Sequence, residues 1–373
     1  MAQKCSRPAY PTQAGSCARK PAAEYPVNEL NPRHASASLP LMPSLRRSTL
    51  AFLTAMLALG TPVPAQDLTD AGFSSRAWET DEGLPHNGVN GIYQSRDGFL
   101  WLATQGGLVR FDGVTFLQRR SPLLINPRTS RVVDIIEENA ETLLIACDTS
   151  GLVRLTKDGF SLHPLSAALG SVLRINAIFP ERPDTFWVLR HDRQLWRWDQ
   201  GKITHFPAPE ATNAAAFGSF ARTKDGVLYV ARGLGLERFD GKDFVRVPEI
   251  EAQAITIASS ATGGLWVASG DSMWKWDGGL PAMVAGATPW TGSPPITLLE
   301  DREGAVWVGS KAQGLFRCSG TEFRPMAISH RRIAALHEDR EGNIWAGTSG
   351  GGLNLIQRAR FQLLDEKSGW TPD

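Results

Sequence analysis

Hydrophobic and polar positions repeat along this chain with a period of 37 to 43 residues. Each of seven repeat units has one large apolar anchor residue. The anchors are Trp101, Leu144, Trp187, Tyr229, Trp266, Trp307 and Trp345. Glycine stands three residues before the anchor in five units, and the second residue after it is Ala or Gly in six. Leu or Met follows the anchor by seven or eight residues in every unit. Residue types that recur at the same distance from each anchor indicate an internal repeat.

Each unit has the pattern of four short strands joined by tight turns. In the first unit the strands are expected at residues 89–94, 99–104, 108–111 and 114–118. Residues 99–104 are apolar on both faces, so both faces of the sheet must be covered. Sheets that stack around an axis cover one another, and a small residue at a fixed position suits the narrow inner end of a wedge. The pattern therefore predicts an all-β fold, a seven-bladed β-propeller of four-stranded antiparallel blades.

The ring is expected to be closed by an N-terminal strand. Residues 73–78 precede the first unit, where a fourth strand precedes each later unit. We expect this segment to pair with residues 353–357 of the last unit. Backbone hydrogen bonds would then hold the two ends of the ring together.

The N-terminal region has the pattern of a secretory signal peptide. Arg46 and Arg47 precede an apolar stretch at residues 50–59, and a small-residue cleavage site ends at Ala65. We therefore expect export to the periplasm. The predicted organisation is a disordered extension at 1–41, a signal peptide at 42–65, the propeller at 66–361 and a linker toward a missing next repeat at 362–373. Met42 is hypothesised to be the true start, which would leave residues 1–41 untranslated.

Composition and charge narrow the classes of partner. The 36 Gly and 12 Trp fit many short strands joined by turns. After residue 65 the chain carries 32 basic and 36 acidic residues without a basic stripe, so nucleic-acid binding is not expected. Cys147 and Cys318, the two cysteines after residue 65, form neither a disulfide framework nor a metal-ligand motif. We expect no metal and no cofactor.

Five segments of the sequence carry a family resemblance. They are WETDEGLPHN at 78–87, DGFLWLAT at 97–104, GLVRFDG at 107–113, EDREGAVWVG at 300–309 and EDREGNIWAGT at 338–348. These segments resemble the repeat of the two-component regulator propeller family. The resemblance is specific in units 1, 6 and 7, and it is weak in units 2 and 3, where Glu141 and Asp184 replace the turn glycine.

The resemblance implies a role in signalling. In this family the propellers form the periplasmic sensing part of membrane-bound histidine kinases, hybrid kinases or diguanylate cyclases. A β-sandwich, a transmembrane helix and a cytoplasmic output domain often follow. Residues 368–373 resemble the linker at 82–87, so we expect a truncated or split sensor that lacks its own output domain. A membrane-bound histidine kinase or diguanylate cyclase is the implied partner.

Motifs of catalysis are not found in the sequence. There is no Gly-x-Ser-x-Gly elbow, phosphate-binding Gly-Lys-Ser loop or His-Glu-x-x-His, so no catalytic residue is predicted and the chain is not expected to be an enzyme. Residues 337–339 (HED) are interpreted as the polar end of a strand. The aromatic pairs at 196–198 and 274–276 are attributed to blade packing rather than to saccharide platforms.

One set of residues is a candidate ligand site. Thirteen residues before the anchor, at the start of the innermost strand, units 2, 3 and 7 carry Arg131, Arg174 and Arg332. The loops that lead into these strands converge on one end of the channel, so three guanidinium groups could surround an anionic ligand. His86 and Asn87 lie at the same end and complete the predicted site.

Two classes of function follow, with a third left open. The preferred one is a periplasmic ligand-sensing module whose ligand is a small molecule or glycan, of anionic character if the arginines bind it. The alternative is an exported propeller enzyme, similar to the virginiamycin B lyase group, with a metal-assisted site. A protein-binding scaffold is the third, since the face of a propeller suits any of these uses.

Overall fold

The computed structural model describes residues 72–359 apart from a few short segments. Those segments are 125–130, 149, 171–173, 210–217, 233–234, 252–254 and 285–287. The described residues belong to the second of two units into which the chain divides, residues 66–373. The predicted extension, signal peptide and C-terminal linker lie outside the described residues. No helix within the described part is long and apolar enough to cross a membrane.

The fold is a seven-bladed β-propeller, as predicted. Seven four-stranded antiparallel sheets follow one another in chain order and are called blades 1 to 7 here. Blades 1 to 4 contain β2 (Val89–Gln94), β3 (Leu100–Thr104), β4 (Gly107–Phe111), β5 (Phe116–Arg119), β6 (Val132–Asn139), β7 (Thr142–Cys147), β8 (Gly151–Thr156), β9 (Gly159–Leu162), β10 (Ile175–Arg182), β11 (Thr185–Arg190), β12 (Leu195–Asp199), β13 (Lys202–Phe206), β14 (Gly218–Arg222), β15 (Leu228–Arg232), β16 (Gly235–Phe239) and β17 (Phe244–Glu251). Blades 5 to 7 contain β18 (Thr256–Ser259), β19 (Leu265–Ser269), β20 (Ser272–Trp276), β21 (Ala282–Met283), β22 (Pro295–Glu300), β23 (Val306–Ser310), β24 (Leu315–Ser319), β25 (Glu322–Met326), β26 (Ile333–Glu338), β27 (Ile344–Thr348), β28 (Leu353–Arg358) and β1 (Phe73–Trp78). A short helix α2 (Leu165–Leu169) and a 3-10 helix (Thr80–Glu82) lie between blades.

The core is divided among the interfaces between blades. The described residues form seven buried apolar clusters, and each cluster joins two neighbouring blades. Every anchor lies on the second strand of its blade and is at most partly exposed. Covering both faces of each sheet therefore stabilises the ring, as the two-sided apolar strands predicted.

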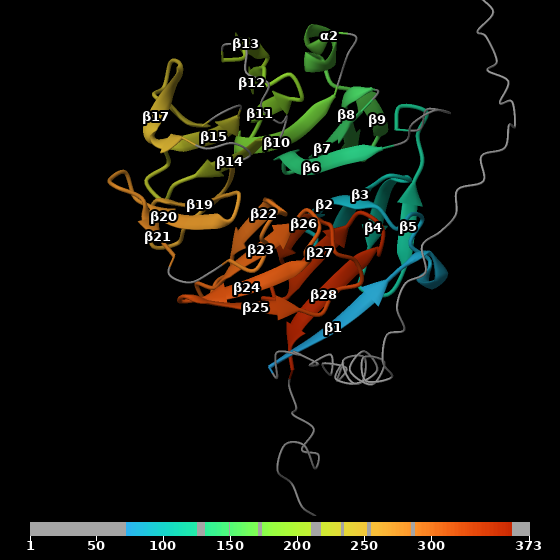
Figure 1. The fold of residues 1–373 in the computed structure, drawn as a ribbon. Coiled ribbons are helices and arrows are strands. Elements are labelled where there is room, and N and C mark those ends of the chain that lie inside the picture. The colour runs from blue at the N-terminus through green and yellow to red at the C-terminus, as the bar shows by residue number, and fades with distance from the viewer. Residues whose placement is uncertain are drawn as a thin grey trace, which may run out of the picture. The chain divides into compact units, whose positions relative to one another are not determined.

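The N-terminal strand closes the ring. β1 pairs with β28 over six residue pairs, from Phe73 opposite Arg358 to Trp78 opposite Leu353. Trp78 is buried, and its ring stacks on Trp345 with centroids 5.6 Å apart. Figure 1 shows the blue β1 beside the red β28, so the two ends of the described chain meet in one blade. The predicted pairing is confirmed.

Small residues fit where the blades converge. A Cβ added to Gly347 would lie 2.8 Å from the backbone oxygen of Val89 in the next blade. Blade 3 has Leu189 at the equivalent position, and there the neighbouring blade supplies Gly218 instead. A Cβ on Gly218 would lie 2.2 Å from the Leu189 side chain. The exception to the small-residue position is thus compensated across the interface.

The turns explain two departures from the sequence pattern. Asp184, which replaces a turn glycine, adopts the left-handed conformation with φ 58° that glycine holds in other blades. The fourth strand of blade 1 begins at Phe116, two residues later than predicted. The Asp112 side chain accepts backbone N–H bonds from Val114 (2.9 Å) and Thr115 (2.6 Å), which keeps these residues in the turn.

Candidate ligand-binding faces

The two ends of the ring carry different loops. The connections between blades and the second turn of each blade lie at one end, called the crossover face here. The first and third turns of each blade lie at the other end, called the turn face. The predicted site residues all lie in connections of the crossover face.

Backbone hydrogen bonds place the three predicted arginines at equivalent points of their blades. The carbonyl oxygens of Arg131, Arg174 and Arg332 each accept an N–H from the second turn of the same blade. The donors are Asp148 (3.2 Å), His191 (2.7 Å) and Ser349 (3.1 Å). The arginines therefore share one end of the ring.

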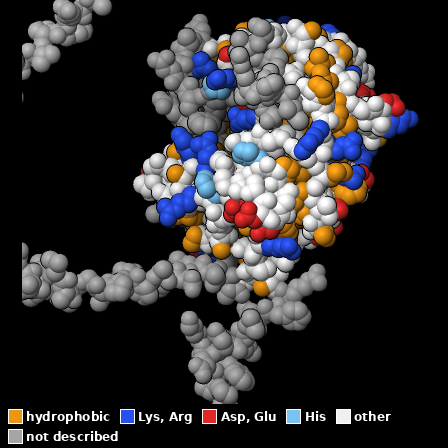
Figure 2. All heavy atoms as spheres, turned by 90° about the vertical axis from the view of Figure 1, so that its right-hand side faces the viewer, with side chains coloured by type: hydrophobic (Ala, Val, Ile, Leu, Met, Phe, Trp, Pro, Cys, Tyr) orange, Lys and Arg blue, Asp and Glu red, His pale blue; other side chains and the backbone are white. Residues whose placement is uncertain are grey.

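The side chains of these arginines differ in their surroundings. Arg131 is exposed and lies 3.3 Å from Asp148 in an ion pair, while Arg174 is exposed and Arg332 is half-buried. An exposed pair of this kind contributes little to stability, about 0–1 kcal/mol. Figure 2 shows one face of the molecule on which Lys, Arg and His side chains lie close together beside a small acidic group. The ligand role of the arginines stays a prediction.

Asn87 and His86 differ in how far their polar atoms are already used. The Asn87 amide donates to Glu79 (3.1 Å) and its oxygen accepts the N–H of Thr80 (2.8 Å), so this side chain holds the connection that follows β1. His86 is exposed, and its Nδ1 accepts the N–H of Gly88 at 2.8 Å. This bond uses Nδ1, and the side chain is exposed, so Nε2 is the nitrogen that can face a ligand.

A second histidine in the same position was missed from the sequence. His330 stands fifteen residues before its anchor, as His86 does, and its Nδ1 accepts the N–H of Arg332 at 3.1 Å. Its ring packs against Gly350, where an added Cβ would lie 3.2 Å from Nε2. Counting back from the anchors was the signal that could have found this pair.

On the turn face, the residue six positions before the anchor accepts the indole N–H in four of the five blades that have a tryptophan anchor, while Trp266 of blade 5 donates to Glu300 of blade 6. Asp301 accepts the indole N–H of Trp307 at 2.8 Å, and Asp339 accepts that of Trp345 at 2.7 Å. Ser95 in blade 1 and Glu181 in blade 3 do the same for their own anchors. The interpretation of residues 337–339 as the polar end of a strand is confirmed.

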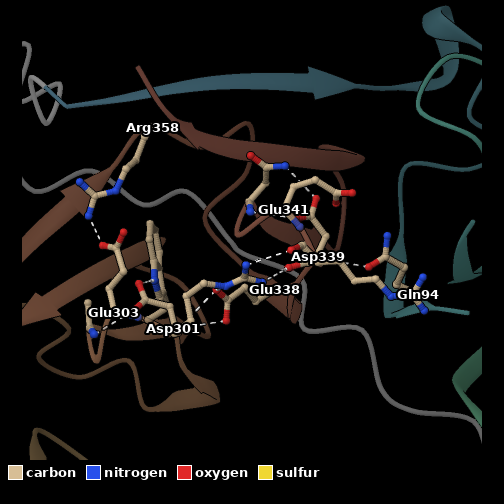
Figure 3. A network of polar contacts seen from close by, with 12 residues as sticks. Gln94, Asp301, Glu303, Glu338, Asp339, Glu341 and Arg358 are labelled. Carbon is tan, nitrogen blue, oxygen red and sulfur yellow. Dashed lines mark hydrogen bonds and ion pairs between the residues drawn. The ribbon is translucent and has the colours of Figure 1, made fainter. Parts of the chain in front are cut away.

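Side chains also connect the first turns of successive blades. Arg302 of blade 6 bonds Glu338 of blade 7 at 2.7 Å and the carbonyls of residues 339 and 340. Arg340 of blade 7 bonds Gln94 and the carbonyls of residues 95 and 96 in blade 1. Figure 3 shows this network running from Asp301 past Glu338 and Asp339 to Gln94. Hydrogen bonds therefore join the first turns of blades 6, 7 and 1 on the turn face.

The aromatic pairs of the third strands belong to blade packing, as predicted. Trp198 and Trp276 are buried in interface clusters, and Trp196 and Trp274 pack against the same clusters.

The residue opposite the anchor on the third strand is basic in six of the seven blades. These residues are Arg110, Arg154, Arg197, Arg238, Lys275 and Arg317.

Asp134 is an isolated carboxylate near the channel. It lies on the innermost strand of blade 2, half-buried, and accepts N–H bonds from Ile135 (2.9 Å) and from Ile178 of blade 3 (3.2 Å). No basic side chain of the described residues lies within ion-pair distance. Burial raises the pKa of Asp134 to about 6.

The raised pKa of Asp134 predicts pH-dependent stability. The folded value of about 6 lies above the ordinary 3.8, so its stabilising contribution is complete below pH 3.8 and is lost as the pH rises through 6. Asp134→Asn should flatten this dependence and gain about 1–2 kcal/mol at pH 7, after the loss of one of the two accepted hydrogen bonds, because the amide NH2 cannot accept an N–H. Chemical denaturation between pH 4 and 8 measures it. Exposed Asp158→Asn is the control, and an unchanged pH slope in the Asp134 variant contradicts the assignment.

The described residues contain no group of three or more His, Cys, Asp or Glu side chains placed to hold a metal. Cys147 and Cys318 are buried free thiols.

Comparison with known proteins identifies the repeat. Residues 83–106 and 327–350 match the sequence profile of the two-component regulator propeller. These segments lie in blades 1 and 7 and contain the innermost strands β2 and β26. The two strands contact each other where the first and last blades meet. Comparison with curated protein sequences gives no significant match.

Solved structures share the fold at low sequence identity. The chain is similar to extracellular domains assigned to the hybrid two component systems BT3049 (20% identity, TM-score 0.62) and BT4673 (18%, 0.63) from B. thetaiotaomicron. The matches cover 77% and 76% of this chain but 42% and 39% of those chains, so it spans less than half of their length. Virginiamycin B lyase from Staphylococcus aureus is also similar, with 15% identity, TM-score 0.61 and coverage of 76% of this chain and 99% of the lyase.

Proposed function

We propose that this chain, which carries two-component regulator propeller repeats, is the ligand-sensing ring of a two-component type signalling receptor. The observation that carries the proposal is the position of the matching repeats. They contain the first two strands of blade 1 and of blade 7, and these two neighbouring blades meet where β1 closes the ring.

We place the sensor in the periplasm. The signal-peptide pattern at residues 42–65 supports export, and the similar structures from B. thetaiotaomicron are extracellular domains. A membrane-bound histidine kinase or diguanylate cyclase is the proposed partner, since sensing outside the membrane needs an output domain inside it.

The ligand of this ring is an anionic small molecule or glycan bound at the crossover face. Arg131, Arg174 and Arg332 supply guanidinium groups at equivalent points of three blades, and His86 lies in the connection of a fourth. Loops on a rigid scaffold often carry binding residues. The ion pair of Arg131 with Asp148 is exposed, so a ligand carboxylate or sulfate can compete for the cation.

Combined replacement of the three arginines by alanine tests this site. The full-length chain is titrated by calorimetry with oligogalacturonates and with neutral oligosaccharides of equal length. An acidic oligosaccharide should bind the wild type and lose at least about tenfold affinity in the triple variant, because charge-assisted hydrogen bonds are removed. The thermal midpoint should change little, since Arg131 and Arg174 are exposed and only Arg332 is half-buried.

A matched control removes three exposed cations elsewhere. Lys224, Arg238 and Lys242 are exposed residues of blade 4, and their replacement by alanine changes the net charge equally. Equal loss of affinity in both triple variants would show that only net charge matters and would refute a site at the crossover face.

A lyase-like enzyme is the second candidate. Virginiamycin B lyase is covered over 99% of its length by this single ring, so the fold is large enough for such an activity. That function predicts turnover that depends on an added divalent metal and is lost with a chelator.

A further inference from the structure

Two blades show how the repeat pairs its third-strand arginine. Arg197 of blade 3 lies opposite Trp187 and bonds both oxygens of Glu181, each at 2.8 Å. In blade 2, Arg154 bonds both oxygens of Glu138, with Nε at 2.7 Å. Glu138 and Glu181 both stand six residues before their anchors. Blades 2 and 3 therefore build the same bidentate arginine–carboxylate contact at equivalent positions.

Blade 1 has the arginine of this contact without its carboxylate. Arg110 lies opposite the anchor Trp101, but the residue six positions before that anchor is Ser95. Ser95 accepts the Trp101 indole N–H at 3.0 Å, so the anchor is satisfied. Arg110 is half-buried and rests on the ring of Phe99 at 4.2 Å. Among the described residues no carboxylate lies within ion-pair distance of its guanidinium group.

A groove opens at this place. It has a volume of about 330 Å³ and lies between blades 1 and 2 on the turn face. Trp101, Leu143 and Leu155 give it an apolar surface, and Arg110 and Arg119 border it. This volume is at the lower end of the range for small-molecule sites, so the groove fits only a small ligand.

Among the described residues, no acidic side chain that lines the groove forms an ion pair with Arg110 or Arg119. Glu137 is paired with Arg96 at 2.9 Å, and Asp97 accepts the hydroxyl hydrogen of Ser95. Glu141 is exposed. In the corresponding groove between blades 6 and 7 the situation differs, since Arg302 and Arg358 are paired with glutamates there.

We propose that the groove between blades 1 and 2 binds a small carboxylate with an apolar body. The carboxylate bonds Arg110 with both oxygens, as the glutamates of blades 2 and 3 bond their arginines. The apolar body lies against Trp101 and the two leucines, and Arg119 adds a second cation. This site is on the turn face and is independent of the arginines on the crossover face.

Phenylacetate is a suitable probe, with phenylacetamide as its neutral counterpart and inorganic phosphate as a plain anion. Binding to the full-length chain is followed by saturation-transfer NMR and calorimetry. We expect saturable phenylacetate binding that is at least about tenfold tighter than that of the amide or of phosphate, because both the charge and the apolar body contribute. Absence of saturable phenylacetate binding, or tighter binding of phosphate, overturns the proposal.

Two variants locate the site. Arg110→Gln should weaken phenylacetate binding at least about tenfold. Ser95→Glu introduces the carboxylate of blade 3, where Trp187, Glu181 and Arg197 already coexist, so the fold tolerates the arrangement and the site is filled from within. It should abolish phenylacetate binding with an equal or higher thermal midpoint.

Arg238→Gln on the exposed surface of blade 4 is the matched control and should bind like the wild type. Unchanged affinity in both the Arg110 and the Ser95 variants overturns the proposal. The crossover-face triple variant should retain phenylacetate binding, so this proposal and the proposed function fail separately.

Discussion

Deletion of residues 66–80 is expected to abolish cooperative unfolding of the ring. The deletion removes β1 and with it six residue pairs to β28. It also removes Trp78, which packs on Trp345 and on Phe111 of blade 1. Loss of a buried tryptophan alone costs about 3–5 kcal/mol. Blades 7 and 1 then lose part of their shared core. The unpaired edge of β28 also promotes aggregation, because its backbone groups can pair with another chain.

Calorimetry distinguishes the outcomes. The wild-type chain should show one sharp transition, and the deletion variant a broad one at lower temperature. Deletion of residues 66–72, which precede β1, is the control and should keep the sharp transition. A deletion variant that melts as sharply as the wild type would show that β1 is dispensable.

Glu138→Ala should be among the most destabilising single substitutions in the chain. Glu138 is fully buried and bonds Arg154 and His163. Burial alone would raise its pKa, but the hydrogen bonds from His163 and Arg154 hold the pKa of Glu138 below its ordinary value. Removing the carboxylate leaves a buried histidine and a mostly buried arginine without their partner, which costs about 3–5 kcal/mol.

Chemical denaturation measures this loss. Exposed Glu141→Ala, in the adjoining turn, is the control and should change the free energy of unfolding by less than about 0.5 kcal/mol. Because the folded pKa of Glu138 is lowered, its stabilising contribution is present at neutral pH and is lost as the pH falls through that pKa. Equal stability of the two variants would contradict the role of Glu138.

Local patterns were enough to predict the ring. The anchors fall on second strands because apolar residues on both faces need cover on both sides, and this requirement is visible within five or six residues. Closure was predictable because residues 73–78 occupy the place of a fourth strand in the repeat. The strand boundary at Phe116 was missed because it depends on hydrogen bonds of one aspartate side chain.

The polar contacts that shape the candidate sites were harder to predict. The position six residues before the anchor holds Ser, Glu, Thr or Asp, so it forms no column of identical residues. The arginine opposite the anchor is nine residues after it in blade 1 and ten after it in blade 2, because the second turns differ in length. Contacts between blades, such as Arg302 with Glu338, depend on the assembled ring. For these reasons the unpaired Arg110 became visible only in the structure.

Native-state hydrogen exchange tests most directly that the seven blades form one closed ring. If closure by β1 makes the ring cooperative, the amide hydrogens in the β1–β28 ladder should exchange as slowly as those of β7 in blade 2, with the same dependence on denaturant. Rapid exchange of β1, or separate exchange of blade 7 ahead of the other blades, would contradict a closed ring.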